Sequence, residues 1–452
     1  MVTFRRPRTD PKDNALAVWT NGERVGVWSI VDGEDRFQYD PAWLGSAAAR
    51  RLSLSLPFTP GNLPHRGQVV HNFFDNLLPD NDAIRRRIRD KFATGSTATF
   101  DLLAAVGRDC VGAVQLLPLD EPPTGLDRIR AAPLDEAGVE RAIFTAVNNA
   151  GIPGQHDTDD FRVSIAGAQE KTALLWHKGR WCRPLGATPT THIFKLPLGL
   201  VGNMRADMST SVENEWLCAH IMAALGFDVA DCEIATFGKV KVLIVERFDR
   251  SLQGGRDRAP WLARLPQEDL CQAMGASGVR KYESEGGPGT QAILRLLENS
   301  TLANADKAVF IKVQLAFWLM AATDGHAKNF SIFLERGGGY RLTPLYDVLS
   351  VWPIIGNGPN QLAYRRAKLA MAIRSKNTHY HLHEIATRHW LGLAQRSGVP
   401  DGFDQMVGMV LQVPDALERV EAMLPPNFPK RVFTSIRDGM VLQAERFVNG
   451  LP

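Results

Sequence analysis

The sequence lacks the features that mark secreted, membrane-spanning and zinc-binding proteins. Its five cysteines are scattered and never form a Cys-x-x-Cys pair, which argues against a structural zinc site and favours a reducing compartment. No run approaches about 18 uninterrupted apolar residues, so no membrane span is expected. The start, MVTFRRPR, has no apolar core of a signal peptide. These absences predict a cytoplasmic protein.

A strong charge of either sign is also missing. The net charge is +3 over 452 residues, which does not mark the whole molecule as a nucleic-acid binder. Hydrophobic residues make up 44% and charged residues 22% of the chain, an ordinary globular composition. The length suits two or three domains. A hairpin with an Asn21-Gly22 turn is expected near the start, and a Pro- and Asp-rich linker at about residues 119–134.

The most unusual stretch is TDGHAKN, which occupies residues 323–329. It follows a mostly apolar run, 309–322, that predicts a buried helix. Loops in such positions often carry chemistry. Two β-rich runs follow, at 330–334 and 340–345, joined by Arg-Gly-Gly-Gly. This pattern predicts a β-hairpin directly after the polar loop.

The hairpin is expected to bring three polar side chains together. With a turn centred on its glycines, Asn329 lies opposite Tyr346 and beside Asp347. Kinase-type phosphoryl transfer needs an Asp that accepts a hydroxyl proton, and an Asn and an Asp on the metal ions. The spacing from Asp324 to Asn329 equals that of the protein-kinase catalytic loop. Asp324 and Asn329 are also explained about as well by an ordinary role in capping helices and turns. A metal hydrolase using Asp324 and His326 is disfavoured, because a lone His fits zinc poorly.

An earlier segment, RVSIAGAQEK at 162–171, is a candidate phosphate loop. Its small residues allow backbone amides to approach a phosphate closely, although it lacks the Gly-Lys-Ser/Thr of a Walker loop and a simple turn is the commoner explanation. Lys195 follows in a strand predicted at 191–196. A buried ammonium needs an anion nearby, and in a kinase that anion is the α/β-phosphate pair of ATP. An edge-strand lysine that reaches solvent is the alternative.

Two further elements between Lys195 and the polar loop are typical of kinases. The helix that begins at Ser211 carries Glu213 and Glu215. Either carboxylate could pair with Lys195, or both could simply favour the positive end of the helix dipole. The strand at 241–246 then leads into a mostly helical region. That junction is where a kinase places its adenine-binding hinge, with backbone groups near Glu246 and Phe248 on the adenine edge.

The order of these parts predicts an α+β protein with a divergent two-lobed protein-kinase-like fold. His-Arg-Asp, Asp-Phe-Gly and a full Gly-x-Gly-x-x-Gly are absent. We expect a β-rich N-terminal lobe with an extra N-terminal subdomain and an all-helical C-terminal lobe. The expected domains are the β-rich and helical N-terminal subdomain at 1–135, the N-lobe core with phosphate loop and hinge at 136–255, and the helical C-lobe with catalytic loop and metal site at 256–452.

Nine long motifs carry a family resemblance. They are FFDNLLPDN, SIAGAQEKTALL, THIFKLPLG, SVENE, VERFDR, RLPQEDLCQ, KYESEGGPG, TDGHAKNFSIF and YRLTPLYDVLS. These stretches closely resemble HipA, the serine/threonine kinase toxins of bacterial HipBA toxin–antitoxin modules. The resemblance extends over most of the chain and is strongest from about Ser164 to Lys368.

The resemblance implies ATP- and Mg²⁺-dependent phosphorylation of a serine on an aminoacyl-tRNA synthetase, typically the glutamyl enzyme, with growth arrest and persistence as the result. Asp324 matches the catalytic base of the family. Asn329 and Asp347 match its catalytic Mg²⁺ ligands. Ser164 matches the autophosphorylated serine, whose phosphate would add about two negative charges to the loop and expel it. The implied ATP-binding residues are Val163, Ser164, Ile165, Ala166, Gly167, Ala168, Gln169, Glu170, Lys171, Lys195, Glu246, Phe248, His326 and Lys328.

The resemblance also implies partners. These are a HipB-type antitoxin, which is a helix-turn-helix dimer, and operator DNA bound through the antitoxin, so that the complex represses its own operon at the nucleoid. Two other functions stay open. One is a kinase of this fold that acts on a small molecule or lipid. The other is a catalytically idle regulator that binds only antitoxin and DNA, against which the joint presence of Asp324, Asn329, Asp347 and Lys195 argues.

Overall fold

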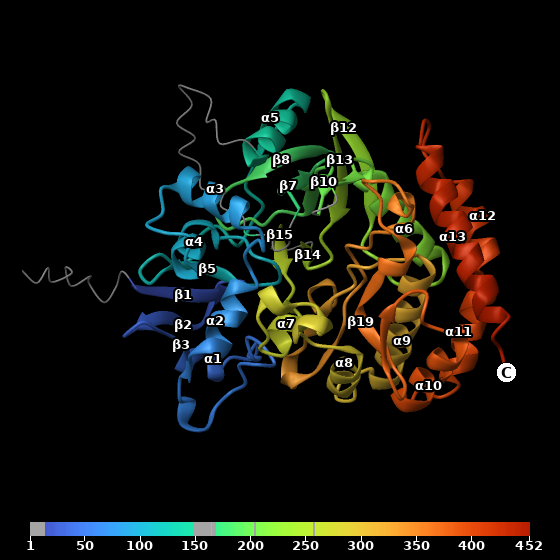
Figure 1. The fold of residues 1–452 in the computed structure, drawn as a ribbon. Helices are drawn as coiled ribbons and strands as arrows, with labels where there is room; N and C mark the ends of the chain where they lie inside the picture. The colour runs from blue at the N-terminus through green and yellow to red at the C-terminus, as the bar shows by residue number, and fades with distance from the viewer. Residues whose placement is uncertain (1–13, 148–163, 165–168, 203–204, 256–257) are drawn as a thin grey trace, which may run out of the picture.

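The computed structural model describes residues 14–147, 164, 169–202, 205–255 and 258–452. Figure 1 shows antiparallel sheets in the N-terminal and middle parts of the chain and helices gathered in the C-terminal part. This is the α+β, two-lobed arrangement expected from the sequence, with an extra subdomain at the start. None of the described helices has the length and apolar character needed to cross a membrane.

The N-terminal subdomain is built on a five-stranded antiparallel sheet. The predicted hairpin forms, because Asn21 and Gly22 both adopt positive φ angles of 46° and 90°, which matches the twist of the flanking strands. Its core contains Trp28 stacked on Phe74 at 4.0 Å between ring centroids. In sheet order the strands are β4 (His65–Arg66), β3 (Glu34–Tyr39), β2 (Glu23–Val31), β1 (Ala15–Thr20) and β5 (Gln115–Pro118), and the helices are α1 (Pro41–Leu44), α2 (Gln68–Asp75), α3 (Asp82–Phe92) and α4 (Thr99–Val106).

The second sheet has six strands and holds Lys195 in an interior strand. Its edge strand β6 lies inside the segment expected to be a linker, where it pairs with β8. In order the strands are β12 (Cys232–Phe237), β13 (Val240–Glu246), β9 (His192–Lys195), β7 (Lys171–His177), β8 (Arg180–Pro184) and β6 (Ala131–Pro133). The accompanying elements are α5 (Glu136–Val147), α6 (Ser211–Ala224) and the short hairpins β10 (Gly199–Val201) with β11 (Ala206–Met208) and β14 (Arg250–Gly255) with β15 (Arg258–Arg264).

The alternation of side chains along β13 gives this sheet two different faces. Val242 and Ile244 belong to a core shared with α5, whereas Leu243 belongs to the larger core that includes α6. Lys195 pairs with Leu243 on one side and with Lys171 on the other. Because directly opposed residues point to the same side of a sheet, both ammonium groups lie on the α6 face.

The C-terminal lobe is mainly helical and surrounds the buried helix α9. Its helices are α7 (Leu270–Ala273), α8 (Thr290–Leu297), α9 (Ala303–Leu319), α10 (Thr387–Ser397), α11 (Gly402–Leu411), α12 (Val413–Glu421) and α13 (Lys430–Val448). The all-helical description expected for this lobe holds for its body only. It also contains a sheet of β16 (Gln267–Asp269), β17 (Ser331–Leu334) and β18 (Tyr340–Leu342), and a hairpin of β19 (Lys368–Arg374) and β20 (Thr378–His381). The catalytic-loop hairpin needs the edge that β16 supplies.

The predicted hairpin after the polar loop forms in a register one residue from the expected one. The turn is centred on Gly337, which has a φ angle of 78°, rather than between Gly337 and the next residue. The ladder does not reach Asn329, which lies in the short 3₁₀ turn Ala327–Asn329, and Leu345 forms a bridge with Val229 instead. The observed pairs are Ile332–Leu342, Phe333–Arg341 and Leu334–Tyr340.

Candidate functional site

Lys195 lies between two carboxylates in the middle of the molecule. Its Nζ is 2.5 Å from Oε1 of Glu215 and 3.0 Å from Oδ1 of Asp347. Only 7% of the side chain is exposed, so Lys195 is not an edge-strand residue that reaches solvent. Burial opposes the charged form, but the charges of Asp347 and Glu215 outweigh it and raise the pKa of Lys195. Of the two candidate acids on α6, Glu215 is therefore the partner, and Glu213 binds Lys241 instead.

Asp347 is held in its charged form by neighbouring lysines. It follows the hairpin in a left-handed backbone conformation with φ of 60°. Burial favours the neutral acid, but Lys195 and Lys171 outweigh this effect and hold the pKa of Asp347 well below its usual range. In contrast to Lys195, Lys171 has a lowered pKa, because burial and the nearby charge of Lys195 bring it to about 8. Two cations thus face one carboxylate.

Asn329 connects the start of the polar loop with the segment that follows the hairpin. Its side-chain amide donates a hydrogen bond to the carbonyl of Asp324 at 2.8 Å and a longer one to the carbonyl of Asp347 at 3.4 Å. Within the described residues, no hydrogen bond is recorded to its side-chain oxygen. The structure therefore brings the Asn329 side chain to the backbones of both Asp324 and Asp347, although the hairpin register differs by one residue.

Asn329 and Asp347 fit a magnesium site that a nucleotide completes. Among the described residues, no group of three His, Cys, Asp or Glu side chains could hold a metal ion unaided. Mg²⁺ is usually held by one or two carboxylates together with substrate phosphates and water. The carboxamide oxygen of Asn329 and the second carboxylate oxygen of Asp347 are hard oxygen donors of this kind. The arrangement suits a metal that arrives with phosphates rather than a permanent structural ion.

Asp324 is more exposed than its neighbours in the loop. Half of its side chain, 51%, is open to solvent, whereas His326 is 4% exposed. Nε2 of His326 lies 3.7 Å from Oδ1 of Asp324, too far for a hydrogen bond, and neither ring nitrogen of His326 has a hydrogen-bond partner among the residues that the structure describes. Burial lowers the pKa of His326. The hydroxyl of Tyr282 donates to Oδ1 of Asp324, so the carboxylate has one occupied oxygen.

Lys328, a predicted ATP-site residue, contacts the N-terminal subdomain. Its Nζ is 2.8 Å from Oδ1 of Asp80 and 3.4 Å from the carbonyl of Asn76. Asp80 also binds Lys281 at 2.9 Å. Burial favours the neutral acid, but the two lysines outweigh it and lower the pKa of Asp80 to about 2. The catalytic loop is therefore anchored by a carboxylate that precedes it by more than 200 residues in the chain.

The predicted phosphate loop is described only in part. Val163, Ile165, Ala166, Gly167 and Ala168 lie outside the described residues.

The remaining loop positions contact other parts of the chain. Ser164 is buried, and its hydroxyl donates to the carbonyl of Leu77 at 2.7 Å. The side-chain amide of Gln169 donates to the carbonyl of Leu196, and Glu170 forms an ion pair with Arg87 of α3. The end of this loop is thus held by both the N-terminal subdomain and β9.

The predicted hinge follows β13 and is partly engaged within the fold. The amide of Glu246 donates to the carbonyl of Asp231 at 2.8 Å, so this backbone donor of the predicted hinge is already used within the fold. The ring of Phe248 lies 5.7 Å from that of Tyr346, next to Asp347, and 5.9 Å from that of Phe333. The hinge and the metal-ligand segment are therefore in contact through aromatic packing.

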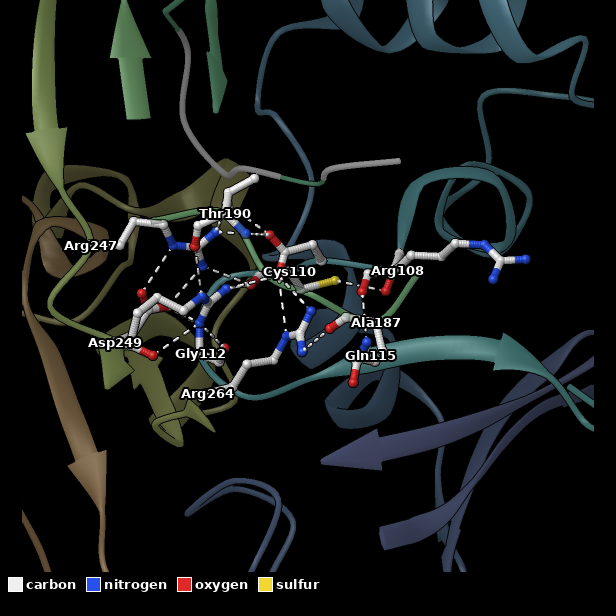
Figure 2. Close-up of polar contacts among 12 residues, drawn as sticks. Arg108, Cys110, Gly112, Gln115, Ala187, Thr190, Arg247, Asp249 and Arg264 are labelled. Carbon is white, nitrogen blue, oxygen red and sulfur yellow. Dashed lines mark hydrogen bonds and ion pairs between the residues drawn. The ribbon is translucent and has the colours of Figure 1, made fainter. Parts of the chain in front are cut away.

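A buried arginine–aspartate network lies behind the hinge. Figure 2 shows Arg247, Asp249 and Arg264 converging around the backbone of Cys110. Asp109 accepts hydrogen bonds or ion pairs from Arg247, Arg250 and Arg264, at 3.4, 2.9 and 3.1 Å. Its backbone carbonyl also accepts from the amide of Ser164 at 3.1 Å. One residue of the N-terminal subdomain thus ties the hinge to the candidate phosphate loop.

Comparison with known proteins identifies the family. A model of the HipA N-terminal domain matches residues 16–117, and a model of the HipA-like C-terminal domain matches residues 163–419. The chain belongs to the HipA family. The HipA relatives include the protein Y4mE of Sinorhizobium fredii, which is 33% identical over 389 residues, 85% of this chain and 86% of that protein.

Another HipA relative carries a functional name. The serine/threonine-protein kinase toxin HipA of Shewanella oneidensis is 28% identical over 392 residues, which is 82% of each chain. A chain in the structure of the Shewanella oneidensis HipA, HipB and operator DNA complex aligns with a TM-score of 0.75, at 24% identity, over 96% of this chain and 97% of that chain. The described part of the chain therefore has the HipA fold.

Three polar residues of this HipA-family chain were not singled out by sequence reasoning. Tyr282 entered only as part of the KYESEGGPG motif, and Asp80 and Asp109 received no role. Asp80 lies in the FFDNLLPDN stretch, whose length and polarity were a signal that it contacts something buried. Asp109 had no comparable signal, because its partners are arginines more than 100 residues later in the chain.

Proposed function

We propose that the chain is an ATP- and Mg²⁺-dependent serine/threonine protein kinase and the toxin of a HipBA-type module. The observation that carries the proposal is the convergence of Asn329 on the backbones of Asp324 and Asp347, with Lys195 bound to the Asp347 carboxylate. Membership of the HipA family supports it, since a relative over most of the chain is named a serine/threonine-protein kinase toxin.

In the proposed reaction, Asp324 accepts the proton of an acceptor hydroxyl. That hydroxyl oxygen forms a bond to the γ-phosphorus of ATP, while the bond between this phosphorus and the bridging oxygen of ADP breaks. The products are a phosphoserine or phosphothreonine and ADP. The partial exposure of Asp324 lets an acceptor on another protein reach it.

The nucleotide is held from both ends in this proposal. Lys195 and Lys171 face the α- and β-phosphates, and the backbone near Phe248 meets the adenine. Asn329 and Asp347 hold Mg²⁺, which when bound neutralises the phosphate charge that develops during transfer. Self-phosphorylation at Ser164 first requires its hydroxyl to leave the carbonyl of Leu77, so it is expected to follow a movement of the loop.

We further propose an aminoacyl-tRNA synthetase, the glutamyl enzyme first, as the acceptor protein. The proposed partner is a small helix-turn-helix antitoxin of the HipB type, which connects the chain to operator DNA. A HipA structure of the same fold was solved together with HipB and its operator DNA, which supports this pairing.

The test is incubation of the purified chain with Mg²⁺, γ-labelled ATP and a panel of aminoacyl-tRNA synthetases, read by mass spectrometry. We expect a phosphorylated serine or threonine on one synthetase. Asp324→Asn keeps the shape of the side chain but removes the base, so transfer should fall by about 10²–10⁴-fold. Asp127→Asn, at a side chain that is 68% exposed, serves as the matched control and should retain full activity.

Each rival function gives a different result in this assay. Label on a lipid or metabolite, with every synthetase unlabelled, would indicate a small-molecule kinase. An idle regulator would label no acceptor, including the chain itself. It would still bind a HipB-type antitoxin and operator DNA. Full transfer by Asp324→Asn would remove Asp324 from the role of base.

A further inference from the structure

A tyrosine lies against the catalytic carboxylate in the described structure. The hydroxyl of Tyr282 donates a hydrogen bond to Oδ1 of Asp324. Its ring meets the ring of His326 edge-on, with centroids 5.1 Å apart and planes at 83°, a favourable geometry for two aromatic rings. Tyr282 therefore contacts both polar side chains at the start of the catalytic loop.

The loop that carries Tyr282 is anchored on both sides of this residue. The preceding Lys281 binds Asp80 at 2.9 Å. The following Glu283 accepts a hydrogen bond from the amide of Ala372 at 2.7 Å and forms an ion pair with Arg374 at 2.5 Å, both on β19. The segment that carries Tyr282 is thus bound to both the N-terminal subdomain and the C-terminal lobe, and this fixes the position of the hydroxyl.

Two glycines let this segment fold tightly on itself. A Cβ at Gly287 would lie 2.1 Å from the carbonyl oxygen of Arg280, and a Cβ at Gly289 would lie 2.1 Å from the carboxyl carbon of Glu283. Any side chain at these positions would displace the loop. The close backbone approach argues that the loop has one packed conformation rather than a swinging one.

The protonation of the groups fixes the direction of the hydrogen bond. Burial and the nearby charge of Asp324 raise the pKa of Tyr282 well above its usual range, so the hydroxyl stays protonated and donates. Oδ1 of Asp324 is then occupied. Within the described residues, no hydrogen bond is recorded to Oδ2, and half of the side chain is open to solvent.

We propose that Tyr282 is a positioning residue of the phosphoryl-transfer reaction. Its hydroxyl fixes the Asp324 carboxylate through Oδ1 and leaves Oδ2 as the oxygen that receives the acceptor's proton. This inference rests on the proposed kinase function and deepens it. Asp80 supports the same arrangement, because it binds Lys281 next to Tyr282 and Lys328 in the catalytic loop, which links the N-terminal subdomain to the orientation of the base.

Tyr282→Phe tests the inference, since it removes the hydroxyl and keeps the ring. We expect kcat to fall by about 10–100-fold, part of the total that a general base contributes, with the KM for ATP unchanged. Both ATP hydrolysis and transfer to a protein acceptor should be measured, with kcat and KM determined separately for each.

Tyr340→Phe is the matched control. It removes a hydroxyl that donates to the carbonyl of Leu296 at 2.5 Å, in the same lobe but outside the polar loop at 323–329, and should leave kcat and the KM for ATP as in the wild type. Lys281→Met cuts one anchor of the loop and should lower kcat by a smaller factor than Tyr282→Phe.

The possible outcomes are distinct. A rise in kcat for Tyr282→Phe would mean that the hydroxyl occupies the acceptor's place, and would overturn the positioning role. An unchanged kcat, or a fall in kcat accompanied by a lower Tm and a higher KM for ATP, would also overturn it. A wild-type chain that transfers no phosphate to water, itself or any acceptor contradicts the proposed kinase function itself.

Discussion

Lys195 has the charge environment that a nucleotide-binding lysine needs. Taking an ammonium out of water is costly unless opposite charges and hydrogen bonds compensate it. Glu215 and Asp347 supply both, and Lys171 adds a second cation directly across the sheet. In the proposed ATP complex, the phosphates would bring further negative charge to a place where two lysines already converge. The contacts of Lys195 with Glu215 and Asp347 hold its ammonium in position without a nucleotide.

Lys195→Met should abolish kinase activity and lower stability. The substitution leaves the buried carboxylate of Glu215 without its cation and removes one cation from Asp347, whose side chain is 30% exposed. Breaking a buried pair typically costs about 3–5 kcal/mol. Chemical denaturation and ATP-binding calorimetry measure the two effects.

Lys241→Met is the control for Lys195→Met. Lys241 lies on β13 and pairs at 2.5 Å with Glu213 of α6; the Lys241 side chain is 48% exposed, whereas that of Glu213 is 5% exposed. Lys241→Met therefore also leaves a buried carboxylate without its cation and should lower stability, but ATP affinity should barely change. An equal loss of ATP affinity in the two variants would contradict the distinct role given to Lys195.

At the scale of elements, the segment after α2 is connected to the catalytic loop. Asp80 receives Lys328 and Lys281, at 2.8 and 2.9 Å, with 17% of its side chain exposed. The carbonyl of Leu77 in the same segment accepts the hydroxyl of Ser164. A single stretch of the N-terminal subdomain therefore touches both the catalytic loop and the candidate phosphate loop.

This connection should make stability depend on pH. The pKa of Asp80 is lowered to about 2 in the folded chain, below the ordinary value of about 3.9. The ion pairs therefore stabilise the fold above about pH 4, by about 2 kcal/mol, and this contribution is lost as the pH falls toward 2. Asp80→Asn should be less stable than the wild type at pH 7, and the difference should shrink as the pH approaches 3.

Urea denaturation of both proteins at a series of pH values measures this difference. Asp90→Asn is the control, because the side chain of Asp90 is 51% exposed beside Arg89. Its stability should differ little from that of the wild type, and this difference should vary little with pH. A gap between Asp80→Asn and the wild type that stays constant down to pH 3 would refute the assignment.

At the scale of the whole molecule, the arginine–aspartate network joins three parts of the chain. Asp109 and the carbonyl of Cys110 belong to the N-terminal subdomain, Arg247 and Arg250 to the hinge, and Arg264 to the strand that enters the C-terminal lobe. Each of these arginines is less than 4% exposed. The subdomain is therefore fixed to the kinase lobes by buried charge as well as by apolar packing.

Asp109→Ala should destabilise the whole chain. The substitution leaves three buried guanidinium groups with only one carboxylate, that of Asp249. The free energy of unfolding is therefore expected to fall by about 3–5 kcal/mol. Because the carbonyl of Asp109 binds Ser164 and its carboxylate binds the hinge, the affinity for ATP should fall as well. Thermal denaturation and nucleotide titration measure both effects, and Asp127→Ala at an exposed site serves as the control. An unchanged Tm would show that the network is dispensable.

Much of the fold and the core of the candidate site were predictable from the sequence. The Asn21-Gly22 turn, the strand around Lys195 and the hairpin after Asn329 follow from local patterns. The hairpin register was wrong by one residue, because three consecutive glycines permit more than one turn centre. The strands β16 and β6 were missed, since strands of three residues carry almost no periodic signal.

The sequence by itself determined the order of the functional parts, because turn chemistry, strand alternation and motif spacing are properties of neighbouring residues. Only the tertiary structure decided between Glu215 and Glu213 as the partner of Lys195, assigned Lys328 to Asp80 and brought Tyr282 to Asp324. Each of these contacts joins residues that are distant in the chain. Which of them meet depends on how sheets and helices pack, and no local pattern encodes that choice.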